Sequence, residues 1–258
     1  MCVIVVKCKG SDFAPAEAIE RCIQTNPHGF AIAWNEGGHV KTFKTMNPSE
    51  AMAKYMELTA TLDPRETAML FHARIATHGS HRVENCHCWV HHGPHGDICF
   101  AHNGVLTNIP ARDDMTDSET FFRDYFVPAL DNVDKDDPEM TFSLRMSRAI
   151  IGDANSKFAF LDGNGRIWMS SGRNPYVKKQ FPGLRGKIYF SNDNWMPRNT
   201  FWGDFNPYSN VPKKSSTKAS GSSLGSAKRN YPAPKEPLAV VNMSMEQLEL
   251  AYQSILDK

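Results

Sequence analysis

The stretch Cys2-Val3-Ile4-Val5-Val6-Lys7-Cys8 at the start of the chain decides the fold. Its β-branched and apolar side chains predict a buried strand that begins at the first residues. Because position 2 holds a small residue, we expect removal of Met1, which would leave Cys2 with a free α-amine. Such an amine has a pKa of roughly 7.7 to 8.0 and can accept a thiol proton near neutral pH. Cys2 is therefore a candidate nucleophile with its own base; the alternative is a buried cysteine that only packs.

The composition predicts a globular protein with reduced thiols. The 258 residues are 41% hydrophobic, enough for a sizeable core, and a net charge of +1 gives no general attraction to nucleic acid or anionic lipid. The apolar N-terminal run is too short for a membrane span and lacks the layout of a secretory signal. We therefore expect a cytoplasmic protein without a membrane partner. Six cysteines are too few for a disulfide scaffold in a chain of this length.

Hydrophobic periodicity predicts strands near both ends of the domain and helices between them. The expected helices cover residues 14–24, 48–62, 118–126 and 140–151, and the expected strands cover residues 2–8, 30–34, 39–44, 67–76, 98–102, 157–161, 166–170 and 187–191. Glycine, histidine and proline between positions 77 and 96 predict one long loop. This order of elements favours a layered α+β domain.

We expect three parts along the chain: a domain over residues 2–212, a flexible Ser/Lys/Pro-rich linker over 213–240, and an amphipathic helix over 241–258. The helix carries an apolar stripe that can pack on its own domain or dock on a partner. The lysines of the linker could contact nucleic acid. Because aromatic residues are nearly absent there, we interpret them as solvated and expect no nucleic-acid partner.

Three further motifs carry chemistry at the ends of predicted elements. Arg74 ends an apolar strand, where a guanidinium can hold a carboxylate; the alternative is a surface arginine. Asn103 and Gly104 end another strand, where an amide and a backbone N–H can point at one oxygen; the alternative is an ordinary turn. Asp117 opens a helix within Thr-Asp-Ser-Glu, where simple capping is the alternative.

Taken together, these motifs resemble the class II glutamine amidotransferases of the N-terminal-nucleophile hydrolase superfamily. The shared pattern is an N-terminal Cys, then His-x-Arg-x-Ala-Thr-His-Gly at residues 72–79, His-Asn-Gly at 102–104, and Asp117 at a helix start. Residues 26–34 and Asn85-Cys86-His87 resemble the corresponding sequences of the stand-alone branch of the family. The resemblance covers about residues 2–195 and implies a four-layer αββα sandwich.

The resemblance also implies site residues. Cys2 would attack the amide carbon of glutamine, and Asn103 with the Gly104 N–H would hold the oxyanion. Arg74 would bind the substrate α-carboxylate and Asp117 its α-ammonium group. The turn formed by Thr77, His78 and Gly79 would line the pocket.

No cofactor is expected, and the Cys- and His-rich run at residues 86–95 has no usual zinc spacing, so we interpret it as a polar loop beside the site. Because only the linker and one helix are predicted after the domain, we expect a separate ammonia-accepting synthase as partner. Two alternatives stay open: hydrolysis of another γ-glutamyl amide that releases an amine, and a non-catalytic binding protein on the same fold.

Overall fold

The structure is a computed structural model that describes residues 2–76, 81–94, 96–107, 109, 115–131, 156–171 and 174–196. Its strands are β1 Val3–Lys7, β2 Phe30–Glu36, β3 His39–Thr45, β4 Met69–Ala73, β5 Trp89–Gly93, β6 Gly96–Asn103, β7 Lys157–Asp162, β8 Ile167–Ser171, β9 Val177–Lys179 and β10 Ile188–Phe190. Its helices are α1 Ala16–Thr25, α2 Pro48–Thr61, the short 3-10 helix Val83–Asn85, α3 Asp117–Phe121, the π-helical segment Phe122–Phe126 and α4 Val127–Asp131.

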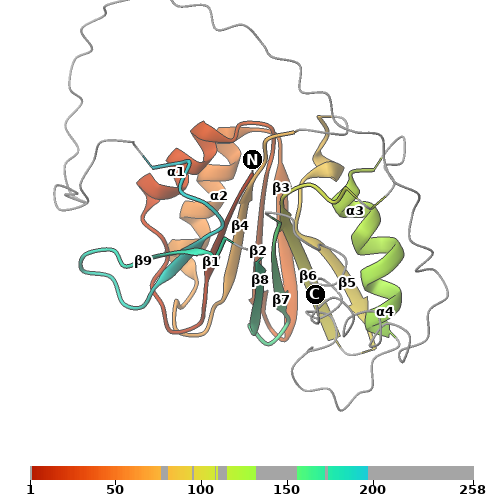
Figure 1. The fold of residues 1–258 in the computed structure, drawn as a ribbon. Coiled ribbons are helices and arrows are strands. Elements are labelled where there is room, and N and C mark those ends of the chain that lie inside the picture. The colour runs from red at the N-terminus through yellow and green to blue at the C-terminus, as the bar shows by residue number, and fades with distance from the viewer. Residues whose placement is uncertain are drawn as a thin grey trace, which may run out of the picture.

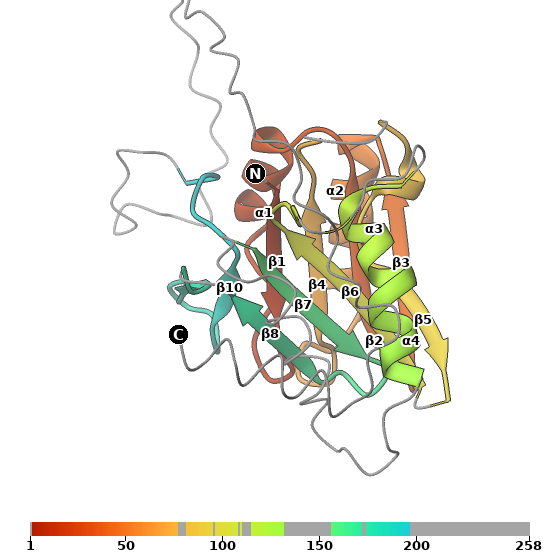
Figure 2. The same ribbon diagram turned by 45° about the vertical axis from the view of Figure 1, so that its right-hand side comes forward.

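The strands form two antiparallel sheets packed face to face. The first sheet has the order β3-β2-β4-β1-β10-β9 and the second the order β5-β6-β7-β8. Helices α1 and α2 cover the outer face of the first sheet, and α3 with α4 covers the outer face of the second (Figure 1). Turned by 45°, the molecule presents α3 and α4 in front of the second sheet (Figure 2). The predicted α+β fold, a four-layer αββα sandwich, is confirmed.

Strand β1 is buried on both faces, which explains its continuous apolar sequence. Val3 and Val5 pack against the helices of the first outer layer, whereas Ile4 and Val6 face the second sheet. Small residues dominate the layer between the sheets and allow the two backbones to approach closely. Those residues include Ala31, Ala33, Ala101 and Ala159.

The helices of the first outer layer have clear sequence causes. Helix α1 buries Ala18, Ile19, Cys22 and Ile23, the apolar stripe expected from the sequence. Helix α2 begins with Pro48, and the Asn47 side chain accepts hydrogen bonds from the first-turn N–H groups. These local signals place both helix starts where the sequence predicts them, within two residues.

The prediction of one long loop over residues 77–96 was wrong. The segment contains a 3-10 helix and strand β5, which forms a hairpin with β6. Trp89 packs on Phe100 and Phe122, while the histidines of β5 lie on an edge strand with partial exposure. Polar residues on an edge strand hid the period-two pattern. The short strand β9 was also not predicted.

Several expectations fall outside the described residues. They are the helix over residues 140–151, the domain end at 212, the linker over 213–240 and the helix over 241–258. Within the described part of the chain, no helix combines the length and apolar character needed to cross a membrane.

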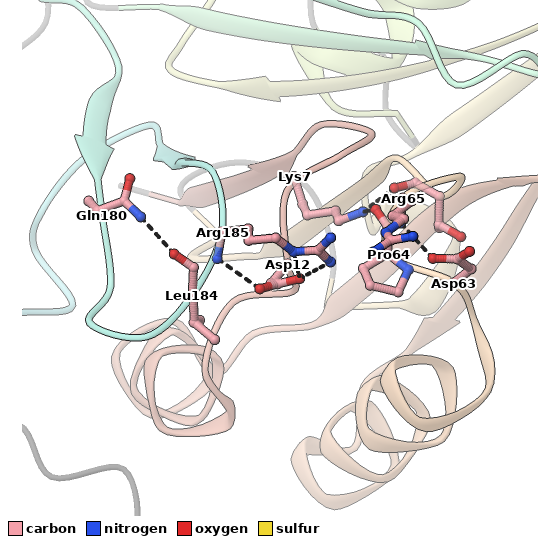
Figure 3. Close-up of polar contacts among 9 residues, drawn as sticks. Lys7, Asp12, Asp63, Pro64, Arg65, Gln180, Leu184 and Arg185 are labelled. Atoms are coloured by element: carbon pink, nitrogen blue, oxygen red, sulfur yellow. Dashed lines mark hydrogen bonds and ion pairs between the residues drawn. The ribbon is translucent and has the colours of Figure 1, made fainter.

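The end of β1 remote from Cys2 is anchored by a buried lysine. Lys7 donates hydrogen bonds from its Nζ to the carbonyls of Pro64 and Thr67 (Figure 3). Burial lowers the pKa of Lys7 to about 8. Beside it, Arg185 pairs with Asp12 at 2.6 Å between Nη2 and Oδ1. The Lys7 end of β1 is therefore fixed by side-chain contacts with the loop before β4.

Asp97 ties the two sheets together at the start of β6. Its carboxylate accepts hydrogen bonds from the Val40 N–H at 2.9 Å, from His39 at 3.2 Å and from His92 at 2.7 Å. Burial acts to raise the pKa of Asp97, but these hydrogen bonds outweigh it and hold the pKa below its usual value. The carboxylate thus bridges β3 of the first sheet and β5 of the second.

Replacement of Asp97 by alanine is expected to lower the free energy of unfolding by about 1–3 kcal/mol, because it leaves the buried Val40 N–H without an acceptor. Urea denaturation measures the change. The matched control is Asp12→Ala, which breaks a more exposed ion pair and should cost less. Equal costs for the two variants would contradict the bridging role of Asp97.

Candidate active site

Cys2 lies at the edge where β1 begins and β4 ends. The antiparallel register pairs Val3 with Ala73, so Cys2 comes opposite Arg74. The Cys2 thiol donates to the carbonyl of Ile75 at 3.5 Å, and its sulfur accepts from the Ile75 N–H at 3.4 Å. The sulfur is thereby held directly beside the residue that follows Arg74.

The surroundings of Cys2 leave it a protonated thiol at neutral pH. Burial raises the pKa of Cys2, although the Ile75 N–H and the positive charge of Arg74 act in the opposite direction. A thiol in this state is a weak nucleophile until a base removes its proton. A nucleophilic role for this thiol would therefore require a base within reach of the sulfur.

Residues 28 and 29 hold the segment that carries Arg74. The Arg74 N–H donates to the Gly29 carbonyl and the His28 N–H donates to the Arg74 carbonyl, both at 2.9 Å. The His28 ring accepts from the Ala76 N–H at 3.1 Å through Nδ1. Gly29 has a φ of +124°, and a Cβ there would lie 2.5 Å from the sulfur of Cys86. Only glycine therefore fits at position 29. Arg74, which this segment carries, is buried with 2% exposure.

Asn103 is the last residue of β6, and Gly104 follows it. The Asn103 Nδ2 donates to Ser191 Oγ at 2.7 Å, and Asn103 Oδ1 has no hydrogen-bond partner among the described residues. Gly104 has a φ of +155°, and a Cβ there would lie 2.3 Å from Ser156 Oγ and 2.8 Å from Ser156 Cα. The strand end therefore admits no side chain at position 104.

Asp117 is not the cap of its helix. Thr116 takes that role, since its Oγ1 accepts the Glu119 N–H at 3.1 Å. The Asp117 Oδ2 instead accepts the Leu106 N–H at 2.6 Å, and Oδ1 accepts from Ser118 at 3.3 Å. The carboxylate is thus linked to the chain just after Gly104. The helix capping that the sequence motif allowed is present, but Thr116 provides it and Asp117 does not.

A stack of buried histidines lies beneath the strand ends. The rings of His72 and His87 are stacked with centroids 4.0 Å apart, and His87 Nδ1 accepts the His102 N–H at 3.1 Å. His102 contacts Ser118 Oγ at 2.7 Å and Ser156 Oγ at 3.1 Å. Burial lowers the pKa of His72 to about 3 and that of His102 to about 4, so both are neutral at pH 7. The stack connects β4, β6 and the start of α3 through uncharged contacts.

A model of the family described as "Glutamine amidotransferases class-II" matches residues 11–182, more than half of the chain. The chain belongs to the class II glutamine amidotransferases. The match begins after Cys2 and includes Arg74, Asn103, Gly104 and Asp117. The amidotransferase family suggested by the sequence motifs is therefore confirmed.

Relatives of this amidotransferase chain extend beyond the matched region. A Haemophilus influenzae protein named "Putative glutamine amidotransferase" is 30% identical over 150 residues, which cover 55% of this chain and 50% of that protein. This chain thus matches about half the length of that relative.

Two solved structures share the fold of the amidotransferase chain. They are the glutamine phosphoribosylpyrophosphate amidotransferase of B. subtilis, with a TM-score of 0.51 and 14% identity, and an allosteric regulatory enzyme of purine biosynthesis, with a TM-score of 0.55 and 13% identity. Each match covers 76% of this chain and 42% of the other. At these identities the likeness supports the N-terminal-nucleophile hydrolase fold alone.

The structure describes five of the predicted site residues of the amidotransferase chain. Cys2 and Arg74 lie at one sheet end, and Asn103 is linked to β1 through Ser191. Gly104 follows Asn103 in the chain, and Asp117 accepts the N–H of Leu106. The predicted pocket-lining residues Thr77, His78 and Gly79 lie outside the described residues. Their expected contribution stays a prediction.

The sequence analysis of this amidotransferase chain missed Ser191 and Asn192, which contact predicted site residues. Ser191 touches Asn103, and Asn192 donates from Nδ2 to the Cys2 carbonyl at 2.6 Å. A sequence signal for them was available, because polar residues stand at the end of the predicted strand over residues 187–191. The same pattern, polar residues at a strand end, had singled out Asn103. Sequence distance from the other motifs concealed it.

The Cys- and His-rich run of the amidotransferase chain is not a polar loop. Cys86 and Cys88 are fully enclosed, and Trp89 begins strand β5. Among the described residues, no group of three His, Cys, Asp or Glu side chains is arranged to hold a metal ion. Within this run, Cys86 and Cys88 pack between the sheets, whereas His92 and Pro94 are exposed.

Proposed function

We propose that this chain hydrolyses the side-chain amide of glutamine through a thioester on Cys2 and supplies the ammonia to a separate acceptor enzyme. The observation that carries the proposal is the position of the Cys2 sulfur. It lies 3.4 Å from the Ile75 N–H, one residue beyond Arg74, and Asn103 is connected to the same strand through Ser191. Membership in the amidotransferase family supports the same reaction.

The chemistry follows from the state of the thiol. Removal of Met1 makes the α-amine of Cys2 available as the base that a protonated thiol requires. The sulfur attacks the amide carbon, and the oxygen that becomes negative is stabilised by the Asn103 amide and the Gly104 N–H. The protonated α-amine then returns the proton to the leaving nitrogen, and ammonia departs. Water attacks the resulting thioester, releases glutamate and restores the thiol.

Recognition of the substrate falls to two charges. Arg74 pairs with the α-carboxylate of glutamine, for which a planar guanidinium is suited. Asp117 pairs with the α-ammonium group, and its link to the Leu106 N–H keeps the carboxylate close to Gly104. Thr77, His78 and Gly79 are proposed to line the pocket. Binding of both charged groups of glutamine holds its side-chain amide carbon over the Cys2 sulfur.

The ammonia acceptor is proposed to be another polypeptide. The two solved relatives are an amidotransferase and a regulatory enzyme, and this chain covers only 42% of each of them. A partner synthase would therefore receive the ammonia, with residues 241–258 as a candidate contact segment.

A second candidate is hydrolysis of another γ-glutamyl amide with release of an amine. Arg74 and Asp117 would contact only the glutamyl half of the substrate, so these contacts do not discriminate among leaving groups. Comparing kcat/KM for glutamine with that for bulkier γ-glutamyl amides separates the two. A ratio that favours the bulky amides would make the amine the product of interest.

The proposal is tested by intact-mass analysis before and after incubation with a diazo-ketone analogue of glutamine. We expect loss of Met1 and a single adduct that peptide mapping places on Cys2, because the analogue combines a glutamyl recognition group with an electrophile at the amide position. The adduct should be absent in Cys2→Ala and present in Cys8→Ala. Retention of Met1 together with no adduct and no ammonia release would favour the non-catalytic alternative.

A further inference from the structure

The residues directly after β10 contact both halves of the proposed catalytic apparatus. We propose that Ser191 and Asn192 are positioning residues: Ser191 orients the oxyanion-binding amide of Asn103, and Asn192 holds the backbone of the nucleophile Cys2. This inference rests on the proposed function, because it assigns its two residues to the same reaction. Neither residue belongs to the motifs that identify the family in this sequence.

Ser191 stands where the ladder between β1 and β10 ends. Its own N–H donates to the Ile4 carbonyl at 2.9 Å, and its Oγ accepts the Ile4 N–H at 2.8 Å. The hydroxyl thus takes the place of the backbone carbonyl that would normally accept this N–H. The freed Ser191 carbonyl accepts a hydrogen bond from the Lys157 ammonium group. Ser191 is fully buried and is held from two sheets at once.

The same hydroxyl fixes the direction of the Asn103 amide. Asn103 Nδ2 lies 2.7 Å from Ser191 Oγ, and Asn103 is 3% exposed. An amide nitrogen has two hydrogens, so the contact with Ser191 occupies one and sets the plane of the other. The remaining N–H is therefore preorganised for an oxyanion, which reduces the rearrangement needed when negative charge develops.

Asn192 performs the matching task for the nucleophile. Its Nδ2 donates to the Cys2 carbonyl at 2.6 Å, while its Oδ1 accepts the Asn194 N–H at 3.1 Å. The second contact fixes the amide orientation, since an N–H can only donate to the oxygen. The Asn192 carbonyl accepts from the Trp195 indole at 3.0 Å, and that ring stacks on Phe190 with centroids 4.3 Å apart. The first residue of the proposed mature chain is thereby tied to a packed aromatic pair.

The test of Ser191 is a double-mutant cycle with Asn103, read as kcat and KM for glutamine. For Ser191→Ala we expect kcat to fall by about 10- to 100-fold with KM within about threefold, as for a misaligned catalytic group. In an Asn103→Ala background the same change should lower kcat by less than about threefold, because its target is gone. The control is Ser11→Ala, a buried serine beyond the other end of β1, which should keep wild-type kcat.

Ser191→Cys has nearly the same volume and keeps a weak hydrogen-bonding group, so it should fold and give an intermediate kcat. For Asn192→Ala we expect slower alkylation of Cys2 by iodoacetamide, a reagent that needs no oxyanion donor, by about threefold or more, as the sulfur leaves the Ile75 N–H. Ser191→Ala should leave that alkylation rate within about twofold, since Ser191 acts on Asn103.

A kcat within threefold of wild type for both Ser191 variants would overturn the inference and leave the proposed function standing. The same holds if Ser191→Ala lowers kcat equally in the wild-type and the Asn103→Ala backgrounds. A wild-type protein that neither hydrolyses glutamine nor reacts with the analogue would overturn both.

Discussion

Replacement of Cys2 by alanine should abolish glutamine hydrolysis, with kcat lower by at least about four orders of magnitude, because no other group can form the thioester. Glutamine should still bind, since Arg74 and Asp117 keep their positions. We therefore expect a dissociation constant within about threefold of wild type by calorimetry. Cys2→Ser should also be strongly impaired, because a hydroxyl holds its proton more tightly than a thiol does.

Cys8→Ala is the matched control for this loss. Cys8 follows the same strand at its remote end, next to the anchored Lys7, and is half-buried. Its removal should leave kcat unchanged. Hydrolysis by Cys2→Ala at more than a tenth of the wild-type rate would contradict a nucleophilic role for Cys2.

The second large effect is acid unfolding driven by the buried histidine stack. His72, His87 and His102 are enclosed, and burial is the main cause that lowers the pKa of each, to about 3 for His72 and about 4 for His102. In the unfolded chain a histidine has a pKa near 6.5. Above pH 6.5 these three histidines are therefore largely unprotonated in both the folded and the unfolded state.

As the pH falls below about 6.5, the unfolded state takes up protons at these positions and the folded state does not. The free energy of unfolding must then decrease, by about 1.4 kcal/mol per pH unit for each histidine. His72 and His102 together would cost on the order of 5 kcal/mol between pH 6.5 and pH 4.5, and His87 acts in the same direction. That is comparable to the whole stability of a typical domain, about 5–15 kcal/mol, so we expect unfolding near pH 4 to 5.

Urea denaturation at several pH values between 7.5 and 4.5 measures this slope. His72→Phe removes one titrating ring whose nitrogens make no hydrogen bond of normal geometry with the described residues, so packing is largely kept. It should reduce the slope by about 1.4 kcal/mol per pH unit. His81→Phe, at an exposed ring, is the control and should keep the wild-type slope. A slope that is equal in all three proteins would contradict this origin of acid sensitivity.

Much of the fold could be predicted because its signals are local. The β-branched run of β1, the apolar stripe of α1 and the Asn47-Pro48 start of α2 each depend on neighbouring residues in the chain. Strand β5 could not be predicted in this way. Its polar side chains lie at a sheet edge, and only its pairing with β6, where Trp89 packs on Phe100, reveals why it is a strand.

By itself, the sequence determined which residue types the proposed site contains, since Cys2, Arg74, Asn103 and Asp117 each end or begin a recognisable element. The tertiary structure alone decided how they are held. Ser191 and Asn192 reach Asn103 and Cys2 only because β1 pairs with β10 across more than 180 positions of sequence. A hydrogen bond depends on distance in space, and a local pattern carries no record of which strand will lie alongside.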